Sequence, residues 1–185
     1  MPSLNPKFLI EVRSIVTNPC GDVLTCSPWE PANSLIKQFI QLLTLLMSQI
    51  TRSITDTTGT ARNVMVDGSD LKCNAGAANT LYGILIGTGT TAVTMADNKL
   101  ETQVTTNIAH AAQTFAVESP DISTWRVSTA RGFTNNTGSI VNVKEVAIYT
   151  AHVAGYYFCI DRTLYPVDIP IGATLTPTYR ITITL

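Results

Sequence analysis

The chain carries little charge, and this scarcity limits what it is expected to bind. Charged residues make up 14% of the 185 positions, against about 25% in ordinary soluble domains. The formal net charge is −1 and no cluster of Lys or Arg is present, so the electrostatic footprint of a nucleic-acid-binding protein is missing. The sequence therefore predicts no nucleic acid among the partners.

Long hydrophobic runs are also missing. Residues 1–7 lack the basic start and apolar core of a signal peptide. The longest apolar stretch, residues 35–47, is interrupted by Lys, Gln and Thr and is too short to span a bilayer. We therefore expect no membrane partner, and synthesis in the host cytoplasm without a cleaved leader.

The residue patterns of catalysis and of cofactor or metal binding are absent from the sequence as well. The two histidines, His110 and His152, fall in unrelated segments without an HExxH motif. Gly87-Thr88-Gly89 follows an apolar run, but no phosphate-binding motif is completed, which favours a glycine-rich turn. We predict no catalytic residue, no cofactor and no metal, and we do not expect an enzyme. Asp67, Asp70 and Asp97 do not have the spacing of a calcium-binding loop, so they predict no calcium site.

Four cysteines are present, at Cys20, Cys26, Cys73 and Cys159. Their spacing contains no CxxC pair and fits no zinc pattern. Cys20 and Cys26 flank a turn and could bridge a hairpin. Free and mostly buried thiols are the favoured alternative in a reducing cell.

Threonine takes the place of much of the missing charge, at 28 positions. It is β-branched and favours strands. A surface of hydroxyl groups costs less to desolvate than one of unpaired charges. The composition therefore favours a β-rich protein whose surface is largely covered by partners, with a threonine-rich monomeric sandwich as the alternative.

The first segment predicts a β-hairpin. Residues 8–16 alternate in polarity, with Glu11 and Arg13 on one face. The turn-forming residues 18–22 then lead to a returning strand at residues 23–26.

One helix is predicted after the hairpin, over residues 35–50, with Asn33 or Ser34 as its cap. Its apolar residues recur at spacings of three and four and form a wide stripe. The helix either covers only its own sheet or also packs one side against a neighbouring subunit.

The second half of the chain predicts mostly strands. Residues 81–86 read as a buried strand, and Asn135–Gly138 reads as a hairpin turn. Residues 174–185 alternate almost perfectly, and Pro177 predicts a sheet edge or a bulge for this last strand. Further strands are predicted at residues 125–133, 139–150 and 156–160.

These elements predict a mainly β fold: an antiparallel β-sandwich, jelly-roll-like, with an N-terminal β-hairpin and one amphipathic helix. We expect residues 1–55 to form the hairpin and helix, and residues 56–185 to form the sandwich, in one structural unit. Segments 51–78 and 87–124 are long for loops of a compact monomer. We therefore expect them to be arms that order on neighbours.

Several segments of the second half, taken in order, resemble those of small virion structural proteins of tailed bacteriophages and related archaeal viruses. The resemblance implies a β-sandwich present in many copies on a capsid or tail, and no catalytic residues. The segments are 81–89 (LYGILIGTG), 97–100 (DNKL), 132–138 (GFTNNTG), 143–149 (VKEVAIY) and 175–185.

We therefore expect a capsid, capsid-decorating or tail subunit, located in the virion, whose partners are copies of itself and other virion structural proteins. A carbohydrate-binding or adhesin-like sandwich is one alternative, and it would need Trp29 and Trp125 in an exposed aromatic row. Their scattered positions at strand spacing favour packing in the core instead. An extracellular filament subunit is another. The candidate subunit-interface residues are Leu35, Phe39, Leu42, Leu43, Leu46, Tyr179, Ile181 and Ile183, with Leu42 taken as exposed.

Overall fold

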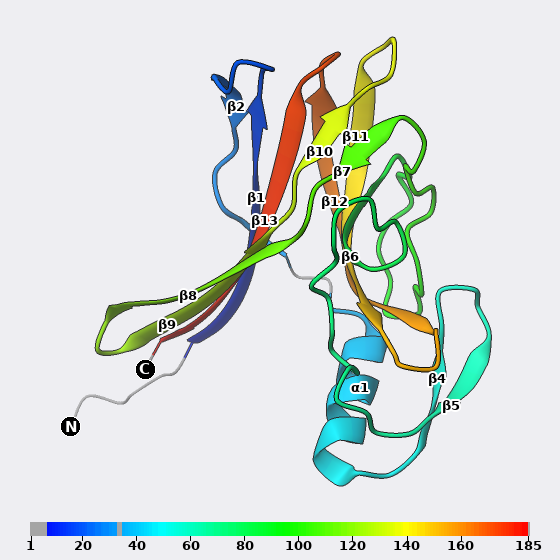
Figure 1. Ribbon diagram of the computed structural model, residues 1–185. Coiled ribbons are helices and arrows are strands. Elements are labelled where there is room, and N and C mark those ends of the chain that lie inside the picture. The colour runs from blue at the N-terminus through cyan, green and yellow to red at the C-terminus, as the bar shows by residue number, and fades with distance from the viewer. Residues whose placement is uncertain (1–6, 33–34, 185) are drawn as a thin grey trace.

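The computed structural model describes residues 7–32 and 35–184, and within them the fold is an antiparallel β-sandwich with one helix, as predicted (Figure 1). The described elements are β1 (Lys7–Thr17), β2 (Val23–Cys26), β3 (Glu30–Pro31), α1 (Lys37–Ser48), β4 (Arg52–Thr55), β5 (Ala61–Val64), β6 (Gly83–Gly87), β7 (Ile108–His110), β8 (Thr114–Asp121), β9 (Thr124–Ala130), β10 (Phe133–Asn135), β11 (Val141–Ala151), β12 (Tyr157–Ile169) and β13 (Thr174–Thr184).

The larger sheet is organised around β13. On one side β13 pairs with β1 along its whole length, and on the other side it pairs first with β10 and then with β9. Strands β2 and β3 extend the sheet beyond β1, while β7 and β8 extend it beyond β10 and β9. The smaller sheet has the order β12-β11-β6, and β4 and β5 form a separate hairpin.

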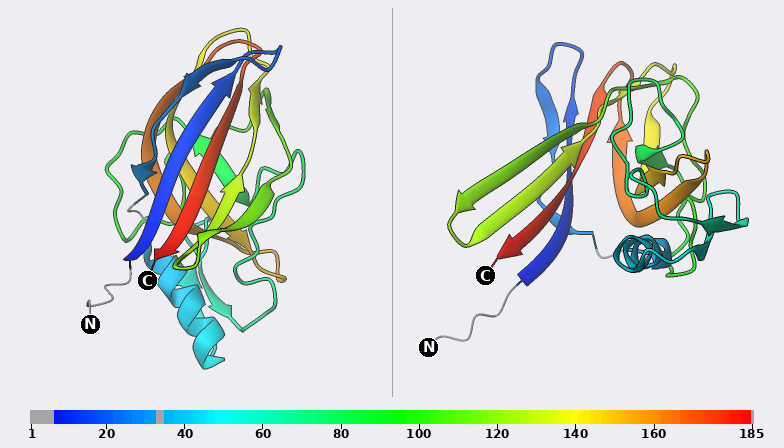
Figure 2. Two further views of the ribbon diagram at one scale, coloured as in Figure 1. Left: turned by 90° about the vertical axis from the view of Figure 1, so that its left-hand side faces the viewer. Right: turned by 60° about the horizontal axis from the view of Figure 1, so that its bottom comes forward.

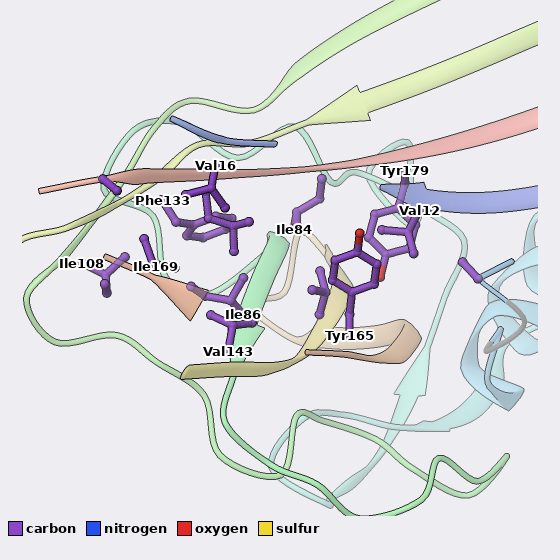
Figure 3. Close-up of a cluster of buried hydrophobic side chains, with 14 residues drawn as sticks. Val12, Val16, Ile84, Ile86, Ile108, Phe133, Val143, Tyr165, Ile169 and Tyr179 are labelled. Atoms are coloured by element: carbon purple, nitrogen blue, oxygen red, sulfur yellow. The ribbon is translucent and has the colours of Figure 1, made fainter. Parts of the chain in front are cut away.

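The main core lies between the two sheets, where alternate residues of each strand point inward (Figure 3). Val12 and Phe133 of the larger sheet meet Ile86 and Val143 of the smaller one, and all four side chains are fully buried. Each such burial contributes roughly 1.5–3 kcal/mol. The alternation that predicted these strands is therefore also what closes the sandwich.

Helix α1 packs against β12 and β4 rather than over the face of the larger sheet. Leu42 and Leu45 are fully buried in a second cluster with Ile54 and Phe158. The predicted helix is confirmed, but it is shorter than expected and begins after Ile36, which provides no side-chain cap. The predicted caps, Asn33 and Ser34, lie outside the described residues.

The front hairpin is confirmed and belongs to the sandwich. The side-chain oxygen of Asn18 closes the turn by accepting hydrogen bonds from the backbone N–H groups of Cys20 and Asp22. Because β1 pairs with β13 across eleven residues, β1 is a central strand of the larger sheet, and β2 lies at its edge. The expected division of the chain into residues 1–55 and 56–185 falls inside the hairpin of β4 and β5.

Two predictions about the second half are corrected by the structure. The single strand expected at residues 125–133 is interrupted at Arg131 and Gly132, which separate β9 from β10. The turn at Asn135–Gly138 does not close a hairpin, because it connects β10 of the larger sheet to β11 of the smaller one.

Pro177 lies in a central strand, so the predicted sheet edge is wrong. It pairs with Ser14 on one side, and on the other its carbonyl accepts the N–H of Arg131 at 3.3 Å. In an antiparallel ladder the N–H and C=O of one residue point to the same neighbour. The N–H that proline lacks would therefore point to the break between β9 and β10, where no regular ladder bond is lost.

The long segments expected to be arms are largely fastened to their own chain. Ile54 and Val64 of the hairpin after α1 are fully buried. The irregular segment 88–103 is tied down by Arg162, which donates to Asp97 at 2.6 Å and to the carbonyl of Thr91 at 3.1 Å. Of these two segments, the part that leaves the body is β8 at the end of the second one, which forms a hairpin with β9 (Figures 1 and 2).

Candidate assembly surface

Part of the larger sheet extends beyond the smaller sheet and forms a projection that we call the wing (Figures 1 and 2). The wing consists of β8, β9, residues 7–12 of β1 and residues 179–184 of β13. Its four strands pair antiparallel in the order β1-β13-β9-β8, with one register shift between Glu118 and Asp121 near the tip of the β8–β9 hairpin. Because side chains alternate along each strand, the register decides which residues share a face.

One face of the wing is apolar and consists of three cross-strand rows. The first row is Phe8, Ile183 and Trp125; the second is Ile10, Ile181, Val127 and Val117; the third is Val12, Tyr179, Thr129 and Phe115. No charged side chain belongs to these rows. Val12 and Tyr179 of the third row are also part of the main core, so the apolar face is a direct continuation of the core.

The opposite face of the wing is polar and is stabilised by an ion pair and by cation–π contacts. Arg180 donates to Glu11 at 2.6 Å, and Glu118 lies opposite Arg126 in the register. The ring of Trp29 stacks against two guanidinium groups, with Arg180 at 3.8 Å and Arg13 at 4.6 Å from the ring centre. The wing is therefore amphipathic, with all of its charge on one side.

Seven of the eleven residues that form the apolar face are exposed. Trp125 is 59% exposed, Phe8 58% and Val117 67%, and Phe115, Val127, Ile181 and Ile183 are also exposed. An aromatic side chain presents roughly 150–250 Å² when fully exposed, and a Val or Ile side chain presents less, so together the seven leave roughly 600 Å² uncovered. The largest apolar patch of a typical monomer is about 300–600 Å². The wing therefore exposes as much apolar surface as a monomer usually tolerates.

A cleft of about 190 Å³ lies at the root of the wing. One wall is the inner part of the apolar face, including Phe115 and Ile181, and the other wall comes from the body. The body contributes Leu35, Phe39, Leu71, Cys73, Ile148 and Ile160. The cleft therefore extends the apolar surface from the wing to the start of α1.

Asp161 is the one carboxyl group that lines this cleft. It is 1% exposed. Its Oδ1 accepts hydrogen bonds from the hydroxyl groups of Tyr179 at 2.9 Å and Thr163 at 3.1 Å, whereas its Oδ2 has no hydrogen-bond partner within residues 7–32 and 35–184. Burial raises the pKa of Asp161 to about 7, against the lowering effect of the two hydroxyl donors. The carboxyl group therefore changes its charge near neutral pH.

The structure brings several of the predicted interface residues together. Leu35, Phe39, Tyr179 and Ile181 all line the cleft, and Ile183 lies on the apolar face of the wing. Leu43 and Leu46 are half-buried on α1. Their contact with a partner stays a prediction.

Leu42 is the exception among the predicted residues. It is fully buried against its own domain, so the expectation that it is exposed is wrong. The apolar stripe of α1 is wide enough to reach both β12 and solvent, and periodicity alone could not tell which side faces inward.

Sequence reasoning missed the largest exposed residues of the wing. The sequence favours a core position for Trp125, and the predicted subunit-interface residues do not include Phe8, Phe115, Val117 or Val127. The signal was present in the alternation of residues 114–118 and 125–129. What was missing is that the smaller sheet ends before it covers them.

The remaining candidate residues have local structural partners. Burial lowers the pKa of His110 to about 4, and its ring packs edge-on against Phe133. His152 stacks on Tyr156, with its Nε2 3.5 Å from Asp70. In residues 7–32 and 35–184, no group of three or more His, Cys, Asp or Glu is placed to hold a metal ion.

All four cysteines are free thiols, and the bridge between Cys20 and Cys26 is not formed. Both of these residues are exposed, contrary to the expectation of mostly buried thiols. Cys159 is buried, and burial raises the pKa of Cys73 to about 11.

The two tryptophans lie on opposite faces of the larger sheet. Trp125 is in the apolar row with Ile183, whereas Trp29 stacks on Arg13 and Arg180 of the polar face. They cannot form one aromatic row of the kind that a sugar platform needs.

No protein-family model, curated protein or solved structure matches this chain. Among the described residues, no helix is both long and apolar enough to cross a membrane.

Proposed function

We propose that this protein is a structural subunit of a virus particle that assembles with copies of itself through the apolar face of the wing. The observation that carries the proposal is the uncovered apolar sheet face, which continues from the core without a charged side chain. Removing such a surface from water contributes about 25 cal/mol per Å². Assembly is the step that would provide this cover.

The low charge of the chain and the resemblance of its second half to small virion proteins support the setting. The positions of Trp29 and Trp125 argue against a carbohydrate-binding module, because the two rings are on opposite faces. An extracellular filament subunit would share the assembly surface and differ only in where the polymer forms.

The contact is tested with a pair of neighbouring substitutions on β8. Val117→Glu places a charge on the apolar face, and Ala116→Glu places the same charge on the polar face; both residues are exposed. Analytical ultracentrifugation of the wild type at micromolar concentration should show oligomers. Val117→Glu should weaken them at least tenfold, and Ala116→Glu should leave them unchanged.

A wild-type protein that stays monomeric at 100 µM and above would contradict assembly through this face, as would equal behaviour of the two variants. The setting is tested separately, by mass spectrometry of particles purified from the source culture on a density gradient. A subunit should be present in many copies per particle. Its absence from particles, with assembly intact, would favour the filament.

A further inference from the structure

The shape of the wing limits what can cover it. Its four strands lie about 4.8 Å apart, so the apolar face is roughly 14 Å wide between the axes of its outer strands. A helix is about 10–12 Å in diameter with its side chains and touches a flat sheet along a narrower line. A helical partner would leave either Phe8 of β1 or Val117 of β8 in water. A second sheet face of the same breadth would cover both.

We infer that the wings of two copies pair face to face about a twofold axis, with Ile181 and Val127 at the centre of the contact. The inference rests on the proposed function and names the partner of the wing as a second copy of the same surface. In a twofold interface each patch meets itself, so a charge near the axis meets its own equivalent. The three rows contain no charge and are therefore compatible with themselves.

The chain already uses this kind of packing internally. Val12 and Tyr179, on the same face of the larger sheet, pack against the smaller sheet in the main core. Stacked sheets lie about 10 Å apart with interdigitating side chains. A second wing would extend this arrangement outward, with Trp125 of each copy as a large apolar anchor.

The area agrees with a dimer contact. The roughly 600 Å² exposed on one wing would give about 1,200 Å² when two wings meet, which is the lower limit for a specific interface. The walls of the cleft, at Leu35 and Phe39, lie beside this area and would add to it.

Single cysteines test whether the patch meets itself. The parent protein carries Cys20→Ser and Cys26→Ser, which remove the two exposed thiols. Ile181→Cys, Val127→Cys and Val117→Cys are then introduced one at a time on the apolar face. Ser128→Cys and Ala116→Cys serve as matched controls, because these residues are next to Val127 and Val117 in the chain but lie on the polar face.

After mild oxidation, at least one of the two central variants, Ile181→Cys or Val127→Cys, should run mainly as a covalent dimer on a non-reducing gel. The parent and both controls should stay single chains. Linking of a central variant without linking of the parent or the controls requires that this part of the surface faces its own equivalent, so this result identifies a twofold contact.

The outcomes separate the inference from the proposed function. If Val117→Glu disrupts the oligomers but no wing cysteine links to its equivalent, the twofold pairing is wrong and assembly through the wing stands. If the wild type is a monomer, both are wrong. Equal linking by controls and central variants also overturns the pairing, because it would reflect random collision.

Discussion

Arg162 and Glu145 form a buried ion pair on the side of the smaller sheet that faces away from the core. The Nε of Arg162 donates to Oε2 of Glu145 at 2.7 Å, and both side chains are at most 2% exposed. The other carboxylate oxygen accepts backbone N–H groups from Gly89 and Thr102, at 3.1 and 3.0 Å. One carboxylate therefore both neutralises a buried arginine and anchors a long loop.

Replacing Glu145 with Gln should strongly destabilise the protein. The buried guanidinium would lose its fully buried counter-charge and keep Asp97, 2.6 Å away, as its remaining partner. Breaking a buried pair costs about 3–5 kcal/mol when the remaining charge is left uncompensated, so with Asp97 in place we expect a loss near the lower end of this range. Urea unfolding followed by tryptophan fluorescence measures the loss. Glu118→Gln, an exposed position on β8, is the control and should change stability by less than about 0.5 kcal/mol. Equal stabilities for the two variants would show that the pair does not hold the loop.

The same carboxylate explains why glycine is needed at residue 87. A Cβ added to Gly87 would lie 2.5 Å from Oε1 of Glu145 and 2.7 Å from the carbonyl oxygen of Thr102. Gly87→Ala should therefore cost about 1–3 kcal/mol by overpacking. At Gly68 a Cβ would meet nothing within 4 Å, so Gly68→Ala should leave the urea midpoint nearly unchanged. A tolerated Gly87→Ala would mean that the loop can move aside.

Asp161 should make stability fall as the pH rises toward neutrality. Its pKa is about 7 in the folded chain, above the ordinary value of 3.8, so between these values the folded state holds a proton that the unfolded state has lost. Over that interval this carboxyl group reduces the unfolding free energy by about 1.4 kcal/mol per pH unit, and above pH 7 the reduction stays constant.

Asp161→Asn removes this titration and isolates its effect. Urea unfolding of both proteins at pH 5 and pH 8 gives the comparison, because groups with lowered pKa values, such as Asp56 and Asp97, affect both proteins alike. The variant should gain stability relative to the wild type on going from pH 5 to pH 8. A difference that does not change with pH would show that Asp161 is ionised throughout.

Substitutions at Leu42 should affect folding, because this side chain is buried within its own chain. Because Leu42 is fully buried beside Leu45 and Phe158, Leu42→Ala should cost about 2–5 kcal/mol, and Leu42→Glu should prevent folding. Met47, on the same helix, is 79% exposed, and Met47→Ala should change stability by less than about 0.5 kcal/mol. Circular dichroism and thermal melting measure both. A folded Leu42→Glu variant would require a different placement of α1.

Much of the β-structure could be predicted because alternation is a local property. The alternation of polar and apolar residues in 8–16 and 174–184 predicts which side chains share a face of the sheet, and β1 and β13 have these faces. The pairing of these two strands with each other could not be predicted, since nothing local connects the start of the chain to its end.

The candidate surface could be predicted only in part for the same reason. Alternation identifies Ile181 and Ile183 as apolar-face residues, but their exposure depends on where the smaller sheet ends. The ion pair of Arg162 and Glu145 joins β11 and β12 across an irregular register. Spacing along the chain does not reveal such a contact.

The break between β9 and β10 leaves only β1 and β13 continuous from the body into the wing. A pull on the wing along its strands is therefore carried by the backbones of β1 and β13, which eleven residue pairs hold side by side. Bending across the strands meets less resistance at Arg131 and Gly132, where the ladder is interrupted. We therefore expect the wing to resist stretching more than tilting, and under the proposed assembly this would let two wings stay in contact while their subunits meet at slightly different angles.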